Sequence, residues 1–341
     1  MAARNILFVK TSSLGDIVHN MPAVTEFARR TAPASIDWVV EEPYAGLLRL
    51  HACINRVIPI AWRRWRSRPA SRETWAEVGA FRSALERVRY DAVIDAQGLV
   101  KSAVISLVAP GERFGYDWPS AREGVASLVY KHKFTVPWSL HAVQRCRSLA
   151  AQVGGYTLDR TVDQLDYGLS LTHRPSNAAP YAVLLHATAR RSKQWDEASW
   201  VQLGQALSAQ GMQVVLPHGT DEELVRSVRL AGEIPNADVP DRVPLDQLAL
   251  TIAGASVVVG VDTGLLHLAA ALRVPLVGIF LDTEPQETGP VGAGPIAVCG
   301  RKGRLVEVVE VLHAVDEVVG PQPLAPAGGE VTYPGDTRIA H

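Results

Sequence analysis

Short runs of apolar, mostly β-branched residues alternate along the chain with longer stretches in which apolar residues recur at helical spacing. The apolar runs predict strands at 6–9, 36–40, 57–60 and 92–95 in the first half, and at 182–185, 213–216, 256–261 and 276–280 in the second. The longer stretches predict helices that include 23–30, 73–89, 199–209, 222–231 and 245–253. Buried strands alternating with helices are typical of parallel sheets covered on both faces.

A break in this pattern divides the chain. Residues 172–180 (THRPSNAAP) have the composition of a linker and separate the two halves. We therefore expect an α/β protein with two Rossmann-like, doubly wound domains, 1–171 and 181–319, that face a central cleft. A last helix is predicted at 305–315, and residues 320–341, rich in Pro and Gly, are expected to form a mobile tail.

Composition and charge narrow the class of protein. Lys and Arg total 34 against 35 Asp and Glu, and the net charge of −1 does not indicate binding to nucleic acid. The three cysteines lie far apart without a CxxC spacing, so neither a disulfide framework nor a zinc site is predicted. No apolar run approaches the ~18 residues that cross a bilayer. The run at 6–9 is too short for a signal peptide, and we expect a cytoplasmic protein.

The loops after the predicted strands are where ligands bind in open α/β sheets, and they lack the common cofactor motifs. No GxGxxG follows the first strand and no GxxxxGK[ST] occurs, which disfavours a nicotinamide oxidoreductase and a P-loop NTPase. HExxH and DxD are also absent, which removes the simplest metal sites. We therefore expect neither a metal nor an organic cofactor.

The first strand runs into KTSSLGDIVH, residues 10–19, whose chemistry has two interpretations. Ser13 and Asp16 have the spacing of a helix capping box, in which Asp16 only satisfies backbone donors. Alternatively, Asp16 lies at the mouth of the cleft as a general base, held ionised by a helix N-terminus. Gly15 permits a tight turn or a close backbone approach. Spacing alone leaves both interpretations open.

Two further segments of the first half concentrate polar groups. The stretch DAQGLVKS, residues 95–102, follows the fourth strand and either faces a ligand or ties adjacent loops together. Residues 63–72 contain five arginines around Trp65. They form either a solvated basic loop or a face that binds phosphate or carboxylate, because guanidinium groups pair with both in bidentate fashion.

In the second half, two segments have the chemistry of an anion site. Lys193 lies just before a predicted helix, where a cation would face a diphosphate, and a plain surface lysine is the alternative. The most specific local signal is GVDTGLLHLAA, residues 260–270, which joins an apolar strand to a helix through Asp262, Thr263 and Gly264. A helix N-terminus of this kind binds phosphate through its dipole and its unpaired N–H groups. His267 can be a core residue, and the pattern gives it no catalytic role.

Together these motifs resemble the bacterial ADP-heptose transferase family. The resemblance runs from about residue 4 to residue 316 and is carried by KTSSLGDIVH, DWVVEEPYA, RVIPIAWRRWR, YDAVIDAQGLVKSA, DWPSARE, LLHATARRSKQW and VDTGLLHLAAAL. It implies a GT-B glycosyltransferase with an acceptor-binding N-terminal domain and a nucleotide-sugar-binding C-terminal domain.

The resemblance implies an inverting, metal-independent transfer of L-glycero-D-manno-heptose from ADP-heptose. The implied acceptor is the 3-deoxy-octulosonate (Kdo) of Kdo2-lipid A, which receives the first heptose of the lipopolysaccharide inner core. A monomer on the cytoplasmic face of the inner membrane is expected.

Individual residues gain roles from the same resemblance. Asp16 matches the general base, and the implied donor-binding residues are Thr188, Lys193, Glu223, Asp262, Thr263, Gly264 and His267. On the acceptor side the implied residues are Ser13, Gly15, Arg63, Arg64, Arg66, Gln97, Lys101, Arg122 and His141. Ala189 stands where a relative often has a second threonine, which puts one phosphate hydrogen bond in question.

Two other functions stay open. A member of the same family that acts on an already heptosylated core would share the fold and the donor, although the arginines at 63–66 and the stretch DAQGLVKSA favour the octulosonate acceptor. A non-catalytic two-domain sugar-binding protein would close on its ligand in a similar way. Such proteins are usually exported, and no signal peptide is predicted here.

Overall fold

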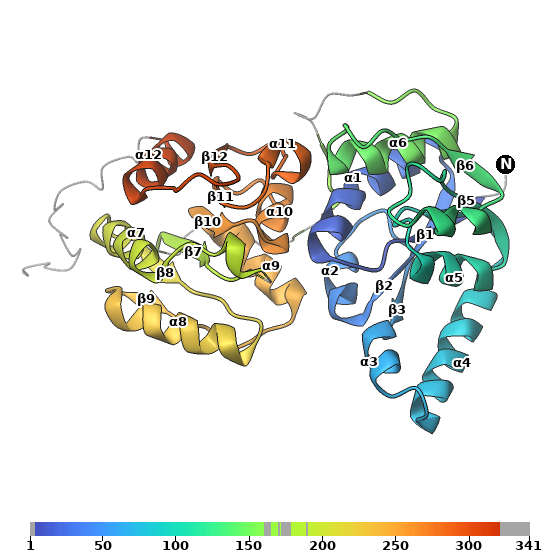
Figure 1. Cartoon of the computed structure of the whole chain (residues 1–341), viewed down its shortest axis with the longest axis horizontal. Helices are drawn as coiled ribbons and strands as arrows, with labels where there is room; N and C mark the ends of the chain where they lie inside the picture. Colours follow the sequence, from blue (N-terminus) through green and yellow to red (C-terminus); the bar gives the residue numbers. More distant parts are fainter. Residues whose placement is uncertain (1–3, 160–164, 170, 172–178, 189, 321–341) are drawn as a thin grey trace, which may run out of the picture.

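The computed structural model describes residues 4–159, 165–169, 171, 179–188 and 190–320, and Figure 1 shows two α/β domains side by side. The N-terminal sheet comprises β1 (Arg4–Val9), β2 (Ala34–Glu41), β3 (Arg56–Ile60), β4 (Tyr90–Asp95), β5 (Gly111–Tyr116) and β6 (His132–Phe134). The C-terminal sheet comprises β7 (Tyr181–Leu185), β8 (Gln213–Val215), β9 (Ala237–Asp238), β10 (Val257–Val261), β11 (Leu276–Phe280) and β12 (Ile296–Gly300). The predicted strands are confirmed to within two residues at each end.

Both sheets are parallel and have the same topology. The orders are β3-β2-β1-β4-β5-β6 and β12-β11-β10-β7-β8-β9, so each domain is a doubly wound Rossmann-like unit. The strand order reverses between β1 and β4 in one domain and between β7 and β10 in the other. Ligands bind at such switch points, outside the carboxyl ends of the strands. The loops after these four strands are those in which the sequence concentrates its polar motifs.

The helices of the N-terminal domain are α1 (Leu14–Arg30), α2 (Ala45–Leu48), α3 (Trp62–Ser67), α4 (Arg72–Glu86), α5 (Val100–Val108) and α6 (Ala142–Gly154), with 3-10 helices η1 (Glu42–Tyr44) and η2 (Gly124–Val129). The C-terminal domain contains η3 (Arg191–Lys193), α7 (Glu197–Ala209), α8 (Asp221–Glu233), α9 (Leu245–Gly254), α10 (Gly264–Ala271), α11 (Pro285–Thr288) and α12 (Val308–Val319).

Several helical segments differ from the sequence-based expectation. The last helix, predicted at 305–315, lies at Val308–Val319. The first helix begins at Leu14 rather than at residue 23, and Pro22 lies inside it. The basic run at 63–72, expected as a loop, begins within the short helix α3. Trp62 and Trp65 fix that helix because they pack on the buried cluster beneath the sheet, and the rings of Trp65 and Phe81 meet edge to face at 5.8 Å.

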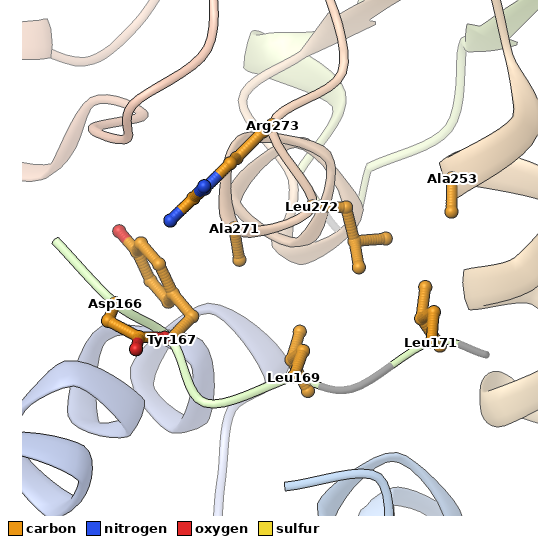
Figure 2. A pocket seen from close by; sticks show the side chains of 8 residues that line it. All are labelled: Asp166, Tyr167, Leu169, Leu171, Ala253, Ala271, Leu272 and Arg273. Carbon is orange, nitrogen blue, oxygen red and sulfur yellow. The ribbon is translucent and has the colours of Figure 1, made fainter. Parts of the chain in front are cut away.

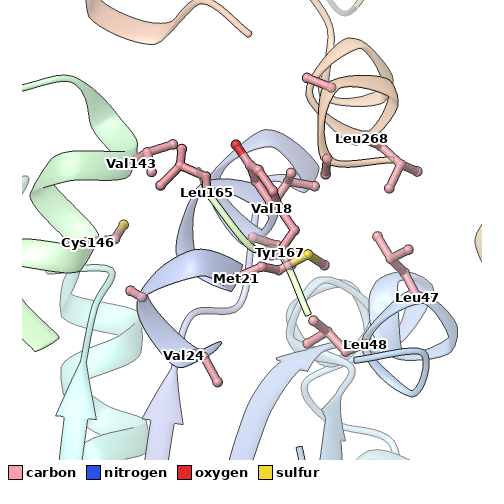
Figure 3. Close-up of a cluster of buried hydrophobic side chains, with 14 of the residues drawn as sticks. Val18, Met21, Val24, Leu47, Leu48, Val143, Cys146, Leu165, Tyr167 and Leu268 are labelled. Carbon is pink, nitrogen blue, oxygen red and sulfur yellow. The ribbon is translucent and has the colours of Figure 1, made fainter. Parts of the chain in front are cut away.

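A continuous apolar core joins the two domains. Figure 3 shows Val18 and Met21 of α1 and Leu48 of α2 within one buried cluster that also contains Leu268 of α10. Because burial of apolar surface holds these helices together, α1 is docked directly on α10. The N-termini of the two helices meet, which brings the first turn of α1 to the first turn of α10.

Part of the predicted organisation lies outside the described residues. This applies to the linker at 172–178, to residue 189 and to the tail at 321–341. The domain boundaries at 171 and 181 therefore stay a prediction.

Candidate active site between the two domains

Asp16 lies in the first turn of α1, at the switch point of the N-terminal sheet. The backbone N–H and the hydroxyl of Ser13 both donate to Asp16 Oδ2, at 3.1 and 3.2 Å. Two Arg122 guanidinium nitrogens donate to the same carboxylate, Nη2 to Oδ1 at 2.5 Å and Nη1 to Oδ2 at 3.2 Å. The local capping interaction is therefore present, and it coexists with a bidentate ion pair to a residue that the sequence places far away.

The surroundings of Asp16 keep it ionised. Burial alone would raise the pKa of its carboxyl, but the charges of Lys10 and Arg122 and the Ser13 N–H outweigh burial and lower the pKa below its ordinary value. Lys10, which is absent from the predicted site list, is buried directly after β1, where its Nζ donates to the Ala96 carbonyl at 2.7 Å. The position of a lysine at the end of the first strand was the available signal for it.

Gln97 and Lys101 hold the loop between β1 and α1. Gln97 Oε1 accepts from the N–H and the hydroxyl of Thr11 at 2.7 and 2.9 Å, and its Nε2 donates to the Ser12 carbonyl at 2.5 Å. The Lys101 Nζ donates to the Ser12 hydroxyl oxygen at 2.7 Å, and burial lowers its pKa. The Gln97 amide thus ties adjacent loops together, the alternative that its sequence position left open, while Lys101 places a cation at the edge of the site.

The three arginines of α3 have different surroundings. Arg64 pairs with Glu42 at 2.5 Å and with Glu77 at 2.8 Å, which fixes it to neighbouring elements. The charge of Arg63 contributes to the lowered pKa of Lys101. Arg66 is exposed on the same helix. Arg63 therefore interacts electrostatically with Lys101, which contacts the loop before Asp16.

A cavity of about 140 Å³ opens beside Asp16 and is lined by both domains. Three cations, Lys10, Arg122 and Arg145, lie in its wall, and Glu287 and Thr288 contribute from the C-terminal domain. The guanidinium of Arg145 lies 3.7 Å from the ring centroid of Trp138, which fixes its position. This set of cations beside an ionised carboxylate suits an anionic ligand that carries a hydroxyl group.

The switch point of the C-terminal sheet holds a second charged group. The Lys193 Nζ lies 2.6 Å from Asp262 Oδ2, and the Thr283 hydroxyl donates to that oxygen at 2.7 Å. The Thr188 hydroxyl donates to the Asp262 carbonyl at 3.1 Å. Thr263 is the N-cap of α10 and Gly264 its first residue. A cation next to the N-terminus of a helix is the chemistry that binds a diphosphate.

Glu223 lies in the first turn of α8, at the same end of the sheet. Its carboxylate accepts from the Gly219 N–H at 2.7 Å, and its own N–H donates to the hydroxyl of the N-cap Thr220 at 3.2 Å. The carboxylate is partly exposed and retains acceptor capacity for a sugar hydroxyl.

Three histidines from two domains pack at the contact between α1 and α10. The His19 ring centroid lies 4.4 Å from that of His267 and 5.8 Å from that of His141. His141 Nε2 lies 3.1 Å from the Gly289 carbonyl oxygen, a contact across the domain boundary. Burial lowers the pKa of all three, that of His267 to about 4, so they are neutral near pH 7. His19 is absent from the predicted list, although its position three residues after Asp16 places it on the same face of a helix.

A larger cavity of about 350 Å³ lies apart from this cluster. Figure 2 shows it between the segment that carries Asp166 and Tyr167 and the end of α10 at Leu272 and Arg273. None of its lining residues is a predicted site residue, although two of them, Asp166 and Arg273, are charged. Predicted site residues, among them Asp16, Gln97 and Arg122, line the smaller cavity instead.

The comparison with known proteins agrees with this geometry. A family model for glycosyltransferase family 9 (heptosyltransferase) matches residues 78–314. The chain belongs to glycosyltransferase family 9. It is 42% identical over 307 residues to lipopolysaccharide heptosyltransferase 1 of Escherichia coli K12. The aligned region covers 89% of this chain and 96% of that protein. The chain is also 27% identical over 129 residues to lipopolysaccharide heptosyltransferase 2 of the same organism. That aligned region covers 36% of this chain and 35% of that protein.

Solved structures extend the likeness to the fold. The E. coli heptosyltransferase WaaC with ADP superimposes with a TM-score of 0.85 at 41% identity, covering 92% of this chain and 99% of that one. The same enzyme with ADP-2-deoxy-2-fluoro heptose gives a TM-score of 0.82 over the same share of both chains. This family 9 chain is therefore a glycosyltransferase with the GT-B fold.

Two negative observations concern the described residues alone. Across the described ranges no group of three or more His, Cys, Asp or Glu side chains is placed to hold a metal ion. Among the helices of the same residues, none is both long and apolar enough to span a membrane.

Proposed function

We propose that this glycosyltransferase moves L-glycero-D-manno-heptose from ADP-heptose to the Kdo residue of Kdo2-lipid A, which begins the lipopolysaccharide inner core. The observation that carries the proposal is the juxtaposition at the meeting of α1 and α10. An ionised carboxylate, Asp16, comes from one domain, and a lysine beside a helix N-terminus, Lys193, comes from the other. The likeness to lipopolysaccharide heptosyltransferase 1 over nearly the whole chain supports the choice of donor and acceptor.

The C-terminal domain has groups that would bind the diphosphate of ADP-heptose. The Lys193 ammonium would leave Asp262 and pair with a phosphate oxygen of the diphosphate. The N–H groups of Thr263 and Gly264 at the start of α10 would donate hydrogen bonds to the same diphosphate. Thr188 supplies a hydroxyl in the adjoining loop. Glu223 would accept from the hydroxyls of the ribose. His267 follows in the first turn of α10, beside Gly15 of the other domain.

The transfer follows from these positions. A hydroxyl of Kdo attacks the anomeric carbon of heptose while Asp16 takes the hydroxyl proton. The new carbon–oxygen bond forms as the bond from the anomeric carbon to the phosphate oxygen breaks, so the configuration inverts. The negative charge that develops on departing ADP is stabilised by Lys193 and the α10 N-terminus, without a metal.

Arg122 links acceptor binding to the base. Its guanidinium donates to both oxygens of Asp16. The carboxylate of Kdo would give Arg122 another partner and leave Asp16 free to accept a proton. The other cations of the wall, Lys10 and Arg145, with Lys101 and Arg63 at its edge, suit the carboxylates and phosphates of the acceptor.

The chain would work as a monomer. It would lie peripherally at the cytoplasmic face of the inner membrane, because its acceptor is a membrane lipid. Basic side chains of the N-terminal domain, such as Arg63 and Arg66, would lie near anionic headgroups. The remaining acceptor-side residues, Ser13, Gly15 and His141, act through the position of α1 and through the contact between the domains.

Release of ADP from ADP-heptose, with Kdo-bearing lipid A as acceptor, tests the proposal. Asp16→Asn is expected to lower kcat by roughly 10²–10⁴-fold, with donor affinity retained. Asp241→Asn, at an exposed loop position, is the matched control and should keep native turnover. Turnover only on an already heptosylated acceptor would assign the alternative acceptor instead. Donor binding without turnover on either acceptor would indicate the sugar-binding protein and refute the enzyme.

A further inference from the structure

The helix α5 buries two serines beside Ala103 and Ile105, and it exposes an apolar stripe. Its serines Ser102 and Ser106 are fully buried. The Ser102 hydroxyl donates to the carbonyl of the N-cap Leu99 at 2.8 Å, and the Ser106 hydroxyl donates to the Ser102 carbonyl at 3.0 Å. Its solvent-facing positions are apolar instead: Val100, Val104, Leu107 and Val108 are 38–52% exposed. Spacings of four, seven and eight residues place these four side chains along one stripe. The helix thus presents an apolar face outward, which predicts a partner for that face.

The 3-10 helix η2 extends this stripe. It packs against α5 through Ala103 and Ala126, and it exposes Val125 (54%) and Leu128 (68%). Trp118 is 56% exposed and lies over the start of η2, where a Cβ on Gly124 would come within 2.8 Å of the indole. We define the α5–η2 surface as Val100, Val104, Leu107, Val108, Trp118, Val125 and Leu128.

The charges around this surface favour an anionic partner. Lys101 is the only charged residue between 100 and 110, and residues 124–130 contain none. Three acids border the surface, and each is hydrogen-bonded or paired. Asp117, next to Trp118, accepts from the Ser120 N–H and from the Thr135 hydroxyl. Glu123 accepts from the Val100 N–H at 2.6 Å, and Glu112 pairs with Lys131 and with His132. The apolar face itself carries no acidic residue and has Lys101 in the first turn of α5, so it suits the boundary between anionic lipid headgroups and an acyl layer.

The α5–η2 surface is also continuous with the acceptor side of the active site. Lys101, in the first turn of α5, donates to Ser12 in the loop before Asp16. Arg122, two residues before η2, holds the Asp16 carboxylate itself. The apolar surface therefore adjoins, along the chain, two residues that contact Asp16 or the loop before it. A lipid whose sugar enters the cavity would have its acyl chains at the adjoining surface.

We propose that the α5–η2 surface docks on the anionic phospholipid bilayer that carries the acceptor. The valine and leucine side chains lie at the boundary between headgroups and acyl chains, and Trp118 lies at headgroup level, where amphipathic rings are stable. This orientation presents the cavity beside Asp16 to the membrane plane. The choice of a bilayer as occupant rests on the proposed lipid acceptor.

Binding of the full chain to vesicles tests this surface without any turnover. The probe is a vesicle of phosphatidylethanolamine with phosphatidylglycerol, compared with pure phosphatidylcholine, in a flotation assay. The triple variant Val104→Gln, Leu107→Gln, Leu128→Gln is expected to bind the anionic vesicles about tenfold or more weakly than the native chain. The matched control is Val225→Gln with Val228→Gln on α8, at 56% and 55% exposure, which should bind as the native chain does.

Further readouts separate docking from folding and from catalysis. Both variants should keep the native melting temperature, because all substituted side chains are exposed. A blue shift of tryptophan emission on addition of vesicles is expected for the native chain and should diminish in Trp118→Phe. With a deacylated, water-soluble Kdo acceptor the triple variant should turn over normally, whereas its turnover on vesicle-embedded acceptor should fall.

Several outcomes would overturn the proposal. These are absence of vesicle binding by the native chain, equal binding by the triple variant, and a dimer of the native chain that the triple variant abolishes, which would assign the surface to a second copy. If no acceptor supports turnover but vesicle binding still depends on the α5–η2 surface, the proposed reaction fails and the docking surface stands.

Discussion

The contact between the first turns of α1 and α10 has no room for a side chain at position 264. A Cβ there would lie 2.7 Å from Leu14 Cβ, 2.9 Å from Leu14 Cγ and 3.0 Å from the Gly15 nitrogen. Carbon atoms in contact are normally about 3.5–4.0 Å apart. Leu14 cannot remove the clash by changing rotamer because its Cβ is fixed to the backbone. Gly264→Ala should therefore push the two helices apart by roughly 1 Å.

This methyl group should destabilise the docked arrangement of the two domains and leave the fold of each domain unchanged. Alanine suits the first turn of a helix, so α10 itself should form normally. Overpacking of this kind costs about 1–3 kcal/mol, which would favour separated domains over docked ones by roughly 5- to 150-fold. A misplacement of about 1 Å between base and donor can itself cost about 100-fold. We expect kcat to decrease by roughly 5- to 150-fold.

The assay is ADP release at saturating donor and acceptor, with donor affinity measured separately by calorimetry. Gly232→Ala is the matched control, since a Cβ there meets nothing within 4 Å and alanine favours the α8 helix. Gly15→Ala should give an intermediate loss, because its Cβ would approach the His267 ring at 3.1 Å and the ring can tilt away. The expected order of kcat is Gly232→Ala above Gly15→Ala above Gly264→Ala.

Either of two results would refute this reasoning. Native kcat in Gly264→Ala would show that close docking of α1 on α10 is not required for transfer. A loss confined to donor affinity, with kcat retained, would show that the methyl group acts on the phosphate-binding turn and not on the approach of the domains.

Two further predictions concern charge. Arg122→Gln removes the bidentate partner of Asp16, so the acid limb of the pH–kcat profile should move to higher pH and the acceptor KM should rise; an unchanged acid limb would contradict the ion pair's role. Buried neutral histidines should make stability fall with acidity, because burial lowers the pKa to about 4 at His51, His186 and His267. The unfolded chain binds these protons near the ordinary pKa of 6.5 and the folded chain does not. Each therefore lowers the unfolding free energy by roughly 1.4 kcal/mol per pH unit between 6.5 and 4. Urea unfolding at pH 7 and pH 5 measures this, and equal midpoints would count against it.

The sequence predicted eight strands, because a strand buried in a parallel sheet is an unbroken apolar run. It did not predict β5, β6, β9 and β12, which are short or only partly buried. Strands such as β10 and β11 are unbroken apolar runs, so their positions follow from composition within a few residues. The polar motifs were predictable as site candidates for a related reason. They follow strands directly, and strand ends in such sheets converge on one edge.

Local rules failed where tertiary packing overrode them. Pro22 marks a probable helix boundary on local grounds, yet it lies within α1. The helix continues because Val18, Met21 and Val24 on either side of the proline are buried in the core shared by both domains. The helix α3 likewise forms from an arginine-rich run because two tryptophans within it are packed beneath.

By itself the sequence determined the two Rossmann-like halves and the loops that carry chemistry, because both depend on the period of apolar positions over short distances. Only the tertiary structure decided the partners. Asp16 and Arg122 are 106 positions apart, and His19 meets His267 across two domains. Such pairs arise from the strand order and from the docking of α1 on α10. Apolar burial drives that docking without directional preference, so no spacing along the chain encodes which side chains it brings together.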